Sequence, residues 1–278
     1  MSWLSRLVAA IRRWLGLARD DRPTVGWRTI DDPLAFIVQR HREGRLATVH
    51  DLLTERRHDW PLPIGWEASE SVLMDDGRVL QTFDFVRPEH DAGDGGQILE
   101  VGADGFVRAI ATRDGGTPYM QYFVGQAYGG TGWIFFGADA PTGRWRELVA
   151  TLAISSWSDA RTPLGKAFTR YRLEMVSFPF AHDGQLERRS LRAVICEHYD
   201  RDTIAGSQAL ERSWFAEGYG LVRWEAWGRT PEAPVADLHE RYNWVAYSDP
   251  PAPGWFMDDV RTYTNIVPCA PTAVSVMS

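Results

Sequence analysis

Cysteine is scarce in this chain, and the spacings that metal sites need are missing. The 278 residues include two cysteines, Cys196 and Cys269, with no CxxC pair and no Cys/His cluster. The seven histidines form no HExxH or HxH pattern. No phosphate-binding loop, dinucleotide fingerprint or nucleophile elbow is present either. The sequence therefore predicts no disulfide framework, no metal site and no bound cofactor.

Long apolar runs and an excess of basic charge are also missing. No stretch approaches the roughly 20 apolar residues that a helix needs to cross a bilayer. The formal net charge is −7, so we expect no nucleic acid among the partners. Lys166 is the only lysine, but this bias toward arginine indicates no mechanism. We expect cytoplasmic synthesis followed by association with a membrane surface or a larger assembly.

Aromatic side chains, in contrast, are plentiful. The chain has 13 Trp, 12% aromatic and 44% hydrophobic residues, which excludes a largely disordered protein. From Trp60 onward, short apolar runs alternate with Gly, Pro and Asp, a texture typical of antiparallel sheets. We predict a mainly β fold, an antiparallel β-sandwich or jelly-roll-like domain over residues 60–230. An irregular C-terminal strap, residues 231–278, is expected to follow it.

Residues 2–19 carry the strongest local pattern, that of an amphipathic helix. One face is apolar, the other is basic, and no acidic residue precedes Asp20. Such a helix suits a lipid headgroup layer, a groove on a partner protein, or the protein's own core. We predict that residues 1–20 anchor the chain to a membrane surface or a protein assembly. The apolar face comprises Trp3, Leu4, Leu7, Val8, Ile11, Trp14 and Leu15, and the basic side comprises Arg6, Arg12, Arg13 and Arg19.

A helical neck is predicted over residues 21–59. Asp31 and Asp32 stand before Pro33, the residue favoured at a first helical position, and Gly44 ends this helix. A further short helix, VHDLLTERRH, is expected after Thr48, which has the spacing of a capping box.

Within the β region, composition predicts loops and alternation predicts buried faces. The glycine-rich segments 89–96 and 125–132 are the best candidates for mobile loops. In TRYRLEM, residues 169–175, alternation places Tyr171, Leu173 and Met175 in the core and Arg170, Arg172 and Glu174 in solvent. LRAVICEHY, residues 191–199, is apolar on both faces and predicts a central strand.

A β-hairpin is predicted around residues 217–220, where SWFA and LVRWEAW flank a Gly-containing turn. Alternation places Trp224 in the core and exposes Trp227 beside Arg223 and Glu225. The segment LERSWFAEGYGLVRWEAWGR, residues 210–229, is similar to a strand–turn–strand signature in uncharacterised β-rich proteins of bacteria and phages. This resemblance implies a hairpin and no activity.

Two kinds of candidate site follow from these patterns. An indole stacks on the apolar face of a sugar ring, which makes Trp133 and Trp227 candidates for an exposed ligand-binding platform. Glycosidase chemistry needs two convergent carboxylates, and Glu197, Glu211 and Glu225 are candidates on adjacent segments. Arg212 and Arg223 offer these carboxylates simple salt bridges instead.

The function predicted from the sequence is a non-enzymatic, anchored accessory or structural module. It attaches through residues 2–19 and presents a β surface to a protein partner or a glycan. The alternatives are a glycosidase-like enzyme that uses a carboxylate pair, and a structural or adhesion component of a phage-like particle.

Overall fold

The protein is almost entirely β in the computed structural model, which describes residues 28–39, 67–73, 77–87, 90–113, 121–124, 126–127, 130–155, 162–182, 185–230 and 249–262. Within these ranges the only helix is the single turn α2, Leu34–Ile37. None of the described helices is long and apolar enough to span a membrane. The helices predicted at residues 2–19 and 49–58 lie outside the described residues.

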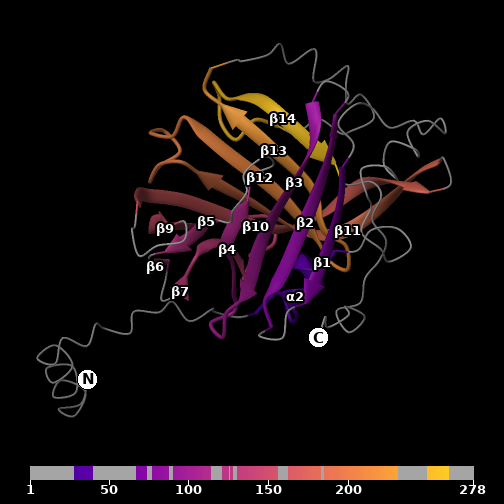
Figure 1. Ribbon diagram of the computed structural model, residues 1–278, viewed down its shortest axis with the longest axis horizontal. Coiled ribbons are helices and arrows are strands. Elements are labelled where there is room, and N and C mark those ends of the chain that lie inside the picture. Colours follow the sequence, from indigo (N-terminus) through magenta and orange to yellow (C-terminus); the bar gives the residue numbers. More distant parts are fainter. Residues whose placement is uncertain are drawn as a thin grey trace, which may run out of the picture.

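Twelve strands form one continuous antiparallel sheet in the order β1-β2-β3-β4-β5-β9-β10-β11-β12-β13-β14, and β8 pairs with β4 outside this path. A separate two-stranded ribbon joins β6 to β7. The strands are β1 (Glu67–Leu73), β2 (Val79–Arg87), β3 (His90–Val101), β4 (Phe106–Arg113), β5 (Gln121–Val124), β6 (Gln126–Ala127), β7 (Gly130–Thr131), β8 (Trp133–Gly137), β9 (Arg146–Ser155), β10 (Thr162–His182), β11 (Gln185–Tyr199), β12 (Ala209–Ala216), β13 (Gly220–Gly228) and β14 (Phe256–Thr262) (Figure 1).

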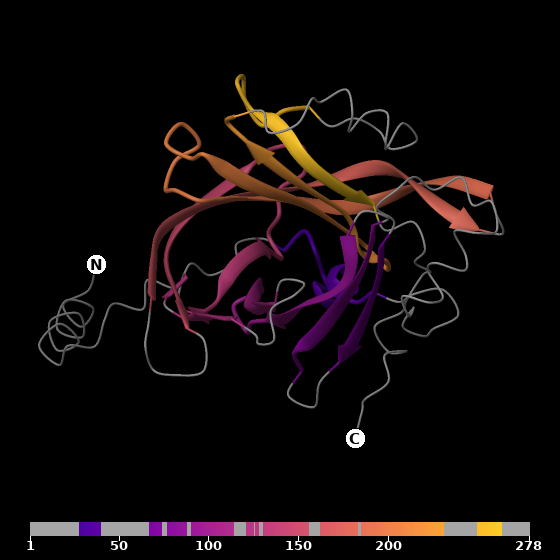
Figure 2. The same cartoon turned by 45° about the horizontal axis from the view of Figure 1, so that its top comes forward.

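This sheet folds over itself into two layers. Figure 2 shows β10 to β14 in the upper layer, with β1 to β4 and β8 beneath it. The mainly β, sandwich-like fold predicted from the sequence is confirmed. The two layers are, however, parts of one hydrogen-bonded sheet, because β5 and β9 pair with each other at the bend.

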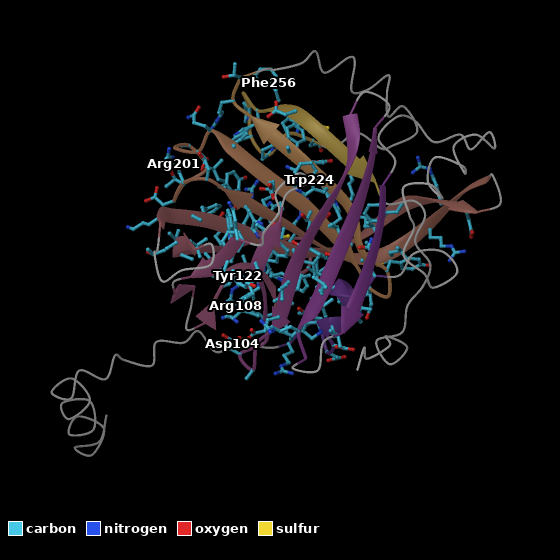
Figure 3. The ribbon with its side chains drawn as sticks, viewed as in Figure 1. Asp104, Arg108, Tyr122, Arg201, Trp224 and Phe256 are labelled. Carbon is cyan, nitrogen blue, oxygen red and sulfur yellow. The ribbon has the colours of Figure 1, made fainter. Side chains whose placement is uncertain are left out.

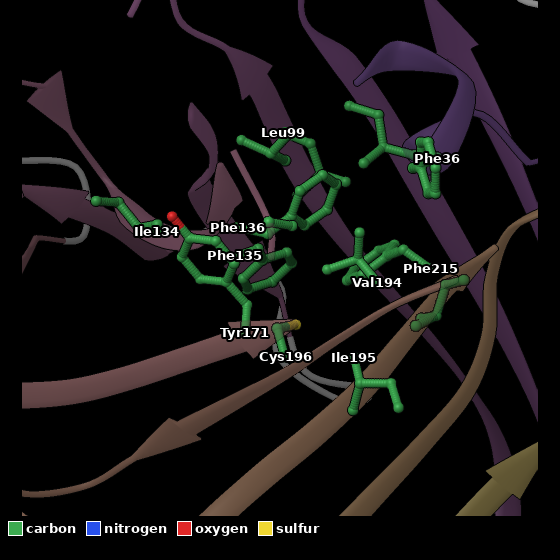
Figure 4. Close-up of a cluster of buried hydrophobic side chains, with 14 of the residues drawn as sticks. Phe36, Leu99, Ile134, Phe135, Phe136, Tyr171, Val194, Ile195, Cys196 and Phe215 are labelled. Atoms are coloured by element: carbon green, nitrogen blue, oxygen red, sulfur yellow. The ribbon is translucent and has the colours of Figure 1, made fainter. Parts of the chain in front are cut away.

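Aromatic and aliphatic side chains fill the space between the layers. Phe136 of β8 contacts Phe36 of α2 and Phe215 of β12, with ring centroids 6.3 Å and 5.6 Å apart (Figure 4). Phe135 lies 5.4 Å from the ring of Phe215. These residues come from widely separated parts of the chain, so burying their apolar surface holds the two layers together.

Central strand β11 is buried on both faces over its C-terminal half, as predicted. Residues 193–199 are all buried, and Cys196 lies among them with a free thiol. The hairpin around residues 217–220 is also confirmed, since β12 pairs with β13.

A chain of buried glutamine amides joins the layers at the α2 end. Gln97 Nε2 donates to Gln81 Oε1 at 2.6 Å, and Gln81 Nε2 donates to Gln39 Oε1 at 2.6 Å. Gln39 Nε2 then donates to the carbonyl of Leu221 on β13 at 2.5 Å. This chain explains why the helix predicted to run to Gly44 ends at Ile37. Val38 is already extended, with φ −81° and ψ 127°, and carries Gln39 into its buried position.

Gly220 makes the close approach of this segment to β13 possible. Its φ is +74°, and a Cβ atom there would lie 2.8 Å from the Cβ of Gln39 and 2.9 Å from the carbonyl oxygen of Val38. Glycine is therefore required both for the backbone conformation and for the space.

Three further expectations were wrong. Residues 90–96, predicted to be a mobile loop, belong to β3 and pair with β2. Residues 126–127 and 130–131, in the second predicted loop, form the β6–β7 ribbon. Residues 256–262, predicted to be irregular, form β14 on the edge of the sheet. In each case a neighbouring strand supplies backbone hydrogen bonds that composition alone does not reveal.

Two residues of β10, Met175 and Arg170, have the opposite burial to the one predicted. Met175 is 62% exposed, because the pairing of β10 with β9 ends at Tyr171 and the strand continues past its neighbour. Arg170 is buried, although alternation placed it in solvent. Tyr171 and Leu173 are buried as predicted.

Candidate functional site

The two faces of the β10–β13 part of the sheet carry different chemistry. On the outer face, register aligns Arg170, Glu197, Arg212 and Glu225 in one row across four strands. On the inner face, which looks toward the other layer, the neighbouring row includes His198 and Glu211. The three carboxylates predicted as a possible catalytic set are therefore divided between two faces.

Glu197 is completely buried and bonded through both oxygens. Its Oε2 accepts hydrogen bonds from Arg170 Nε and from the Tyr199 hydroxyl, each at 2.5 Å. Its Oε1 accepts from Arg212 Nε at 2.8 Å, and Arg212 Nη2 also lies 2.8 Å away. Charge-assisted bonds of this bidentate kind are the strong ones in proteins.

Glu225 is bonded in the same way two strands further along, on β13. Its Oε1 accepts from Arg223 Nε at 2.7 Å, and its Oε2 accepts from the Trp227 indole at 2.8 Å. Arg212 Nη1 reaches Oε2 at 3.3 Å, so Arg212 links the two glutamates. The salt bridges expected from Arg212 and Arg223 are confirmed. We call these residues the outer cluster: Arg170, Glu197, Tyr199, Arg212, Arg223, Glu225 and Trp227.

A covering segment, residues 249–257, completes the outer cluster. The carbonyl of Asp249 accepts a hydrogen bond from Arg212 Nη1 at 2.8 Å, and the carbonyl of Pro251 accepts from Arg170 Nη2 at 3.3 Å. Trp255 and Met257 of this segment are buried in a second apolar group with Phe168, Tyr199, Leu210 and Trp227.

Burial shifts the ionisation of the groups in this cluster. It raises the pKa of Tyr199, and the charge of Glu197 raises it further, so the phenol stays protonated and donates its hydrogen bond. Burial lowers the pKa of Arg223, while the attraction of Glu225 opposes that shift. The two carboxylates of the cluster are thus surrounded by hydrogen-bond donors in fixed positions.

Trp227 contradicts its predicted exposure. It is 1% exposed and donates to Glu225, although it lies on the side of the strand that alternation assigned to it. The error came from treating an Arg/Glu face as a solvent face. The charged side chains pair with one another and are covered, so the indole beside them is covered too. Trp224 lies on the inner face, partly buried against the main core.

Glu211 and Trp133 lie on the other side of the sheet. Glu211 is exposed and stands opposite His198 in the register. Trp133 of β8 is half-buried, with its ring 5.0 Å from the His198 ring, and its indole donates to Thr169 Oγ1 at 3.2 Å. Trp133 and Glu211 each lie beside His198, whereas Trp227 lies on the outer face.

His198 is held in its neutral form between aromatic rings. Its ring stacks on Phe135 at 4.5 Å, and Nε2 lies 3.0 Å from the carbonyl oxygen of Ile134. Burial lowers the pKa of His198 to about 3, while the bond to Ile134 acts in the opposite direction. Because a carbonyl oxygen only accepts, Nε2 carries the proton and Nδ1 does not.

Cys196 and the described metal-ligating side chains show no activated arrangement. Burial raises the pKa of the Cys196 thiol far above its usual range, which keeps it protonated and unreactive. Across the described ranges, no group of three or more His, Cys, Asp and Glu side chains is arranged to hold a metal ion. At the β3–β4 turn, Asp104 and Arg108 form a further partly buried ion pair at 2.6 Å (Figure 3).

Sequence reasoning missed Arg170 and underrated His198. Arg170 was assigned to solvent. It lies opposite Glu197 in the register, however, and donates a hydrogen bond to that carboxylate. The available signal was the alternation of positive and negative residues at matching positions of four successive strands. His198 was correctly separated from Glu197 and Tyr199 by alternation, but its aromatic neighbours come from β8 and follow from no local pattern.

Comparisons with protein-family models, with curated proteins and with solved structures found no match for this chain. The hairpin implied by the resemblance at residues 210–229 is present, and the relationship to bacterial and phage proteins stays a prediction.

Proposed function

We propose that this protein is a non-enzymatic accessory or structural module. It attaches through residues 2–19 to a membrane surface or a larger assembly and presents its β body to a protein partner or a glycan. The observation that carries the proposal is the bonding of Glu197 and Glu225, whose four carboxylate oxygens all accept hydrogen bonds from neighbouring side chains.

A glycosidase requires a different environment for its carboxylates. The general acid has to reach the glycosidic oxygen, and its partner has to reach the anomeric carbon or a water. Glu197 and Glu225 are fully buried and lie beside the covering segment. Glu211 is exposed but occupies the opposite face, so it shares no site with the other two. These positions favour a structural role for the first pair.

Attachment through residues 2–19 rests on their sequence. Seven apolar residues segregate from four arginines, and two of the seven are tryptophans. Indole and guanidinium groups both favour the headgroup region of a bilayer, where each meets a suitable polarity. An anionic vesicle surface is therefore the first partner to test.

Vesicle flotation of the full chain provides the test. Leu7→Asp with Ile11→Asp places two charges on the apolar face, while Ser2→Asp with Ser5→Asp adds the same charge to the polar side. We expect wild type and the serine variant to float with vesicles of phosphatidylcholine and phosphatidylglycerol, and the Leu7/Ile11 variant to remain in the pellet fraction. Equal flotation of the two variants, or no flotation of wild type, contradicts lipid attachment.

A further inference from the structure

The covering segment reaches the outer cluster immediately before β14, which lies at one end of the strand order (Figure 1). Its residues 249–255 read DPPAPGW, so three of the seven are prolines, which have no N–H to donate to a neighbouring strand. Pro253 and Gly254 lie in a turn, and the φ of Gly254 is +81°. This part of the segment therefore lies against the sheet without the hydrogen bonding of a regular strand.

Three guanidiniums hold residues 249–255 through carbonyl groups. The bonds are Arg212 Nη1 to Asp249 at 2.8 Å, Arg170 Nη2 to Pro251 at 3.3 Å and Arg229 Nη1 to Pro253 at 3.3 Å. Two of the three are longer than the roughly 2.7–3.2 Å that is usual for such bonds, so they are weak. Arg170 and Arg212 also donate to Glu197, and these bonds remain if the segment moves away.

Trp255 anchors the segment, but its indole N–H is unsatisfied. The side chain is 4% exposed, with its ring 5.8 Å from the Tyr199 ring and the Arg229 guanidinium 4.4 Å from its centroid. Nε1 is buried and has no hydrogen-bond acceptor among the described residues. Trp227, in the same apolar group, gives its indole N–H to Glu225. Because water bonds an exposed N–H, moving Trp255 into solvent recovers a hydrogen bond that the closed segment lacks.

We infer that the covering segment is a movable cover: residues 249–255 leave the outer face while the sheet beneath them stays folded. Long bonds from side chains and an unsatisfied anchor make this local opening less costly than separating paired strands. The outer cluster holds three guanidiniums and two carboxylates, so opening presents a surface of net positive charge that the closed segment hides. This device is independent of the attachment proposed for residues 2–19.

Hydrogen exchange of the full chain, followed by NMR in urea concentrations below the unfolding transition, tests the inference. The indole N–H of Trp255 reports movement of the segment, and the backbone N–H of Ile195, on β11 between β10 and β12, reports opening of the sheet. We expect protection at Trp255 to be lower by about tenfold or more, and to depend less on urea because less surface becomes exposed. Equal protection and equal urea dependence overturn the inference. Full exchange of Trp255 at the rate of an unfolded chain also overturns it, because the segment would then not close.

Two glycine variants separate local opening from unfolding. Gly254→Ala and Gly77→Ala each place a Cβ at a positive φ, +81° and +83°, with no atom closer than 3.6 Å, so each strains only the backbone. Gly77 lies between β1 and β2. We expect Gly254→Ala to speed exchange at Trp255 about tenfold. Gly77→Ala should leave Trp255 unchanged and speed exchange at Ile195. Equal acceleration of Trp255 exchange by the two variants contradicts local opening.

Discussion

The outer and inner faces of β10 to β13 stabilise their buried polar groups in different ways. On the outer face, charged residues saturate one another: two carboxylates accept from three guanidiniums, a phenol and an indole, and the covering segment bonds two of the guanidiniums. On the inner face, a neutral imidazole is packed between aromatic rings and bonds a backbone carbonyl through Nε2. The outer face therefore balances buried charge with opposite charge, whereas the inner face keeps a buried titratable ring neutral.

Removing one charge from the outer cluster should have the largest effect. Glu197→Gln leaves the buried guanidinium of Arg170 without its anion and Arg212 with Glu225 alone, so we expect a loss of about 3–5 kcal/mol in the free energy of unfolding. Urea unfolding followed by tryptophan fluorescence measures it. Glu174→Gln breaks the half-exposed pair with Arg172 and should cost only about 0–1 kcal/mol. If the two variants lose similar stability, the outer cluster has no special structural role.

Acid should lower the free energy of unfolding through His198 on the inner face. Its pKa falls from 6.5 to about 3 on folding, so between these pH values the unfolded chain binds a proton that the folded chain excludes. This contribution to stability is complete above pH 6.5 and is lost as the pH falls toward 3, by at most about 1.4 kcal/mol per pH unit.

His198→Phe isolates this contribution, because phenylalanine keeps the ring packing and does not titrate. Unfolding measured at several pH values should show wild type losing stability faster than the variant below pH 6.5. Parallel curves would mean that His198 is protonated equally in both states.

The glutamine chain offers a neutral counterpart to the outer cluster. Gln81→Leu leaves the Gln39 carbonyl and the Gln97 amide without their partner, and we expect a loss of about 1–3 kcal/mol. Gln208→Leu, at an exposed position, is the control and should change stability little. If Gln81→Leu lowers the free energy of unfolding as much as Glu197→Gln does, the neutral glutamine chain and the ionic outer cluster contribute equally to stability.

Glu211→Gln should have the smallest effect on folding. Its side chain is exposed, so we expect a change of about 0–1 kcal/mol by the same urea measurement. A loss comparable to that of Glu197→Gln would contradict the exposed position of Glu211 and place its side chain in a buried network.

Much of the fold follows from local pattern, because strand alternation and turn residues act over a few positions. The central strand at 191–199, the hairpin at 217–220 and the sides taken by Trp224 and Trp227 were all predictable. The burial of Trp227 and Arg170 was not, because it depends on residues 249–257, which are distant in sequence. The contact between Trp133 and His198 was not predictable either, since the two rings meet only after the sheet folds over.

Product release from a panel of bacterial surface polysaccharides tests most directly whether the buried glutamates are structural. Wild type, Glu197→Gln, Glu211→Gln and Glu225→Gln are compared under conditions in which circular dichroism shows all four to be folded. The account predicts no release above the buffer level by any of them. Release by wild type that disappears in folded Glu197→Gln or Glu225→Gln would contradict it, because that residue would then take part in the reaction.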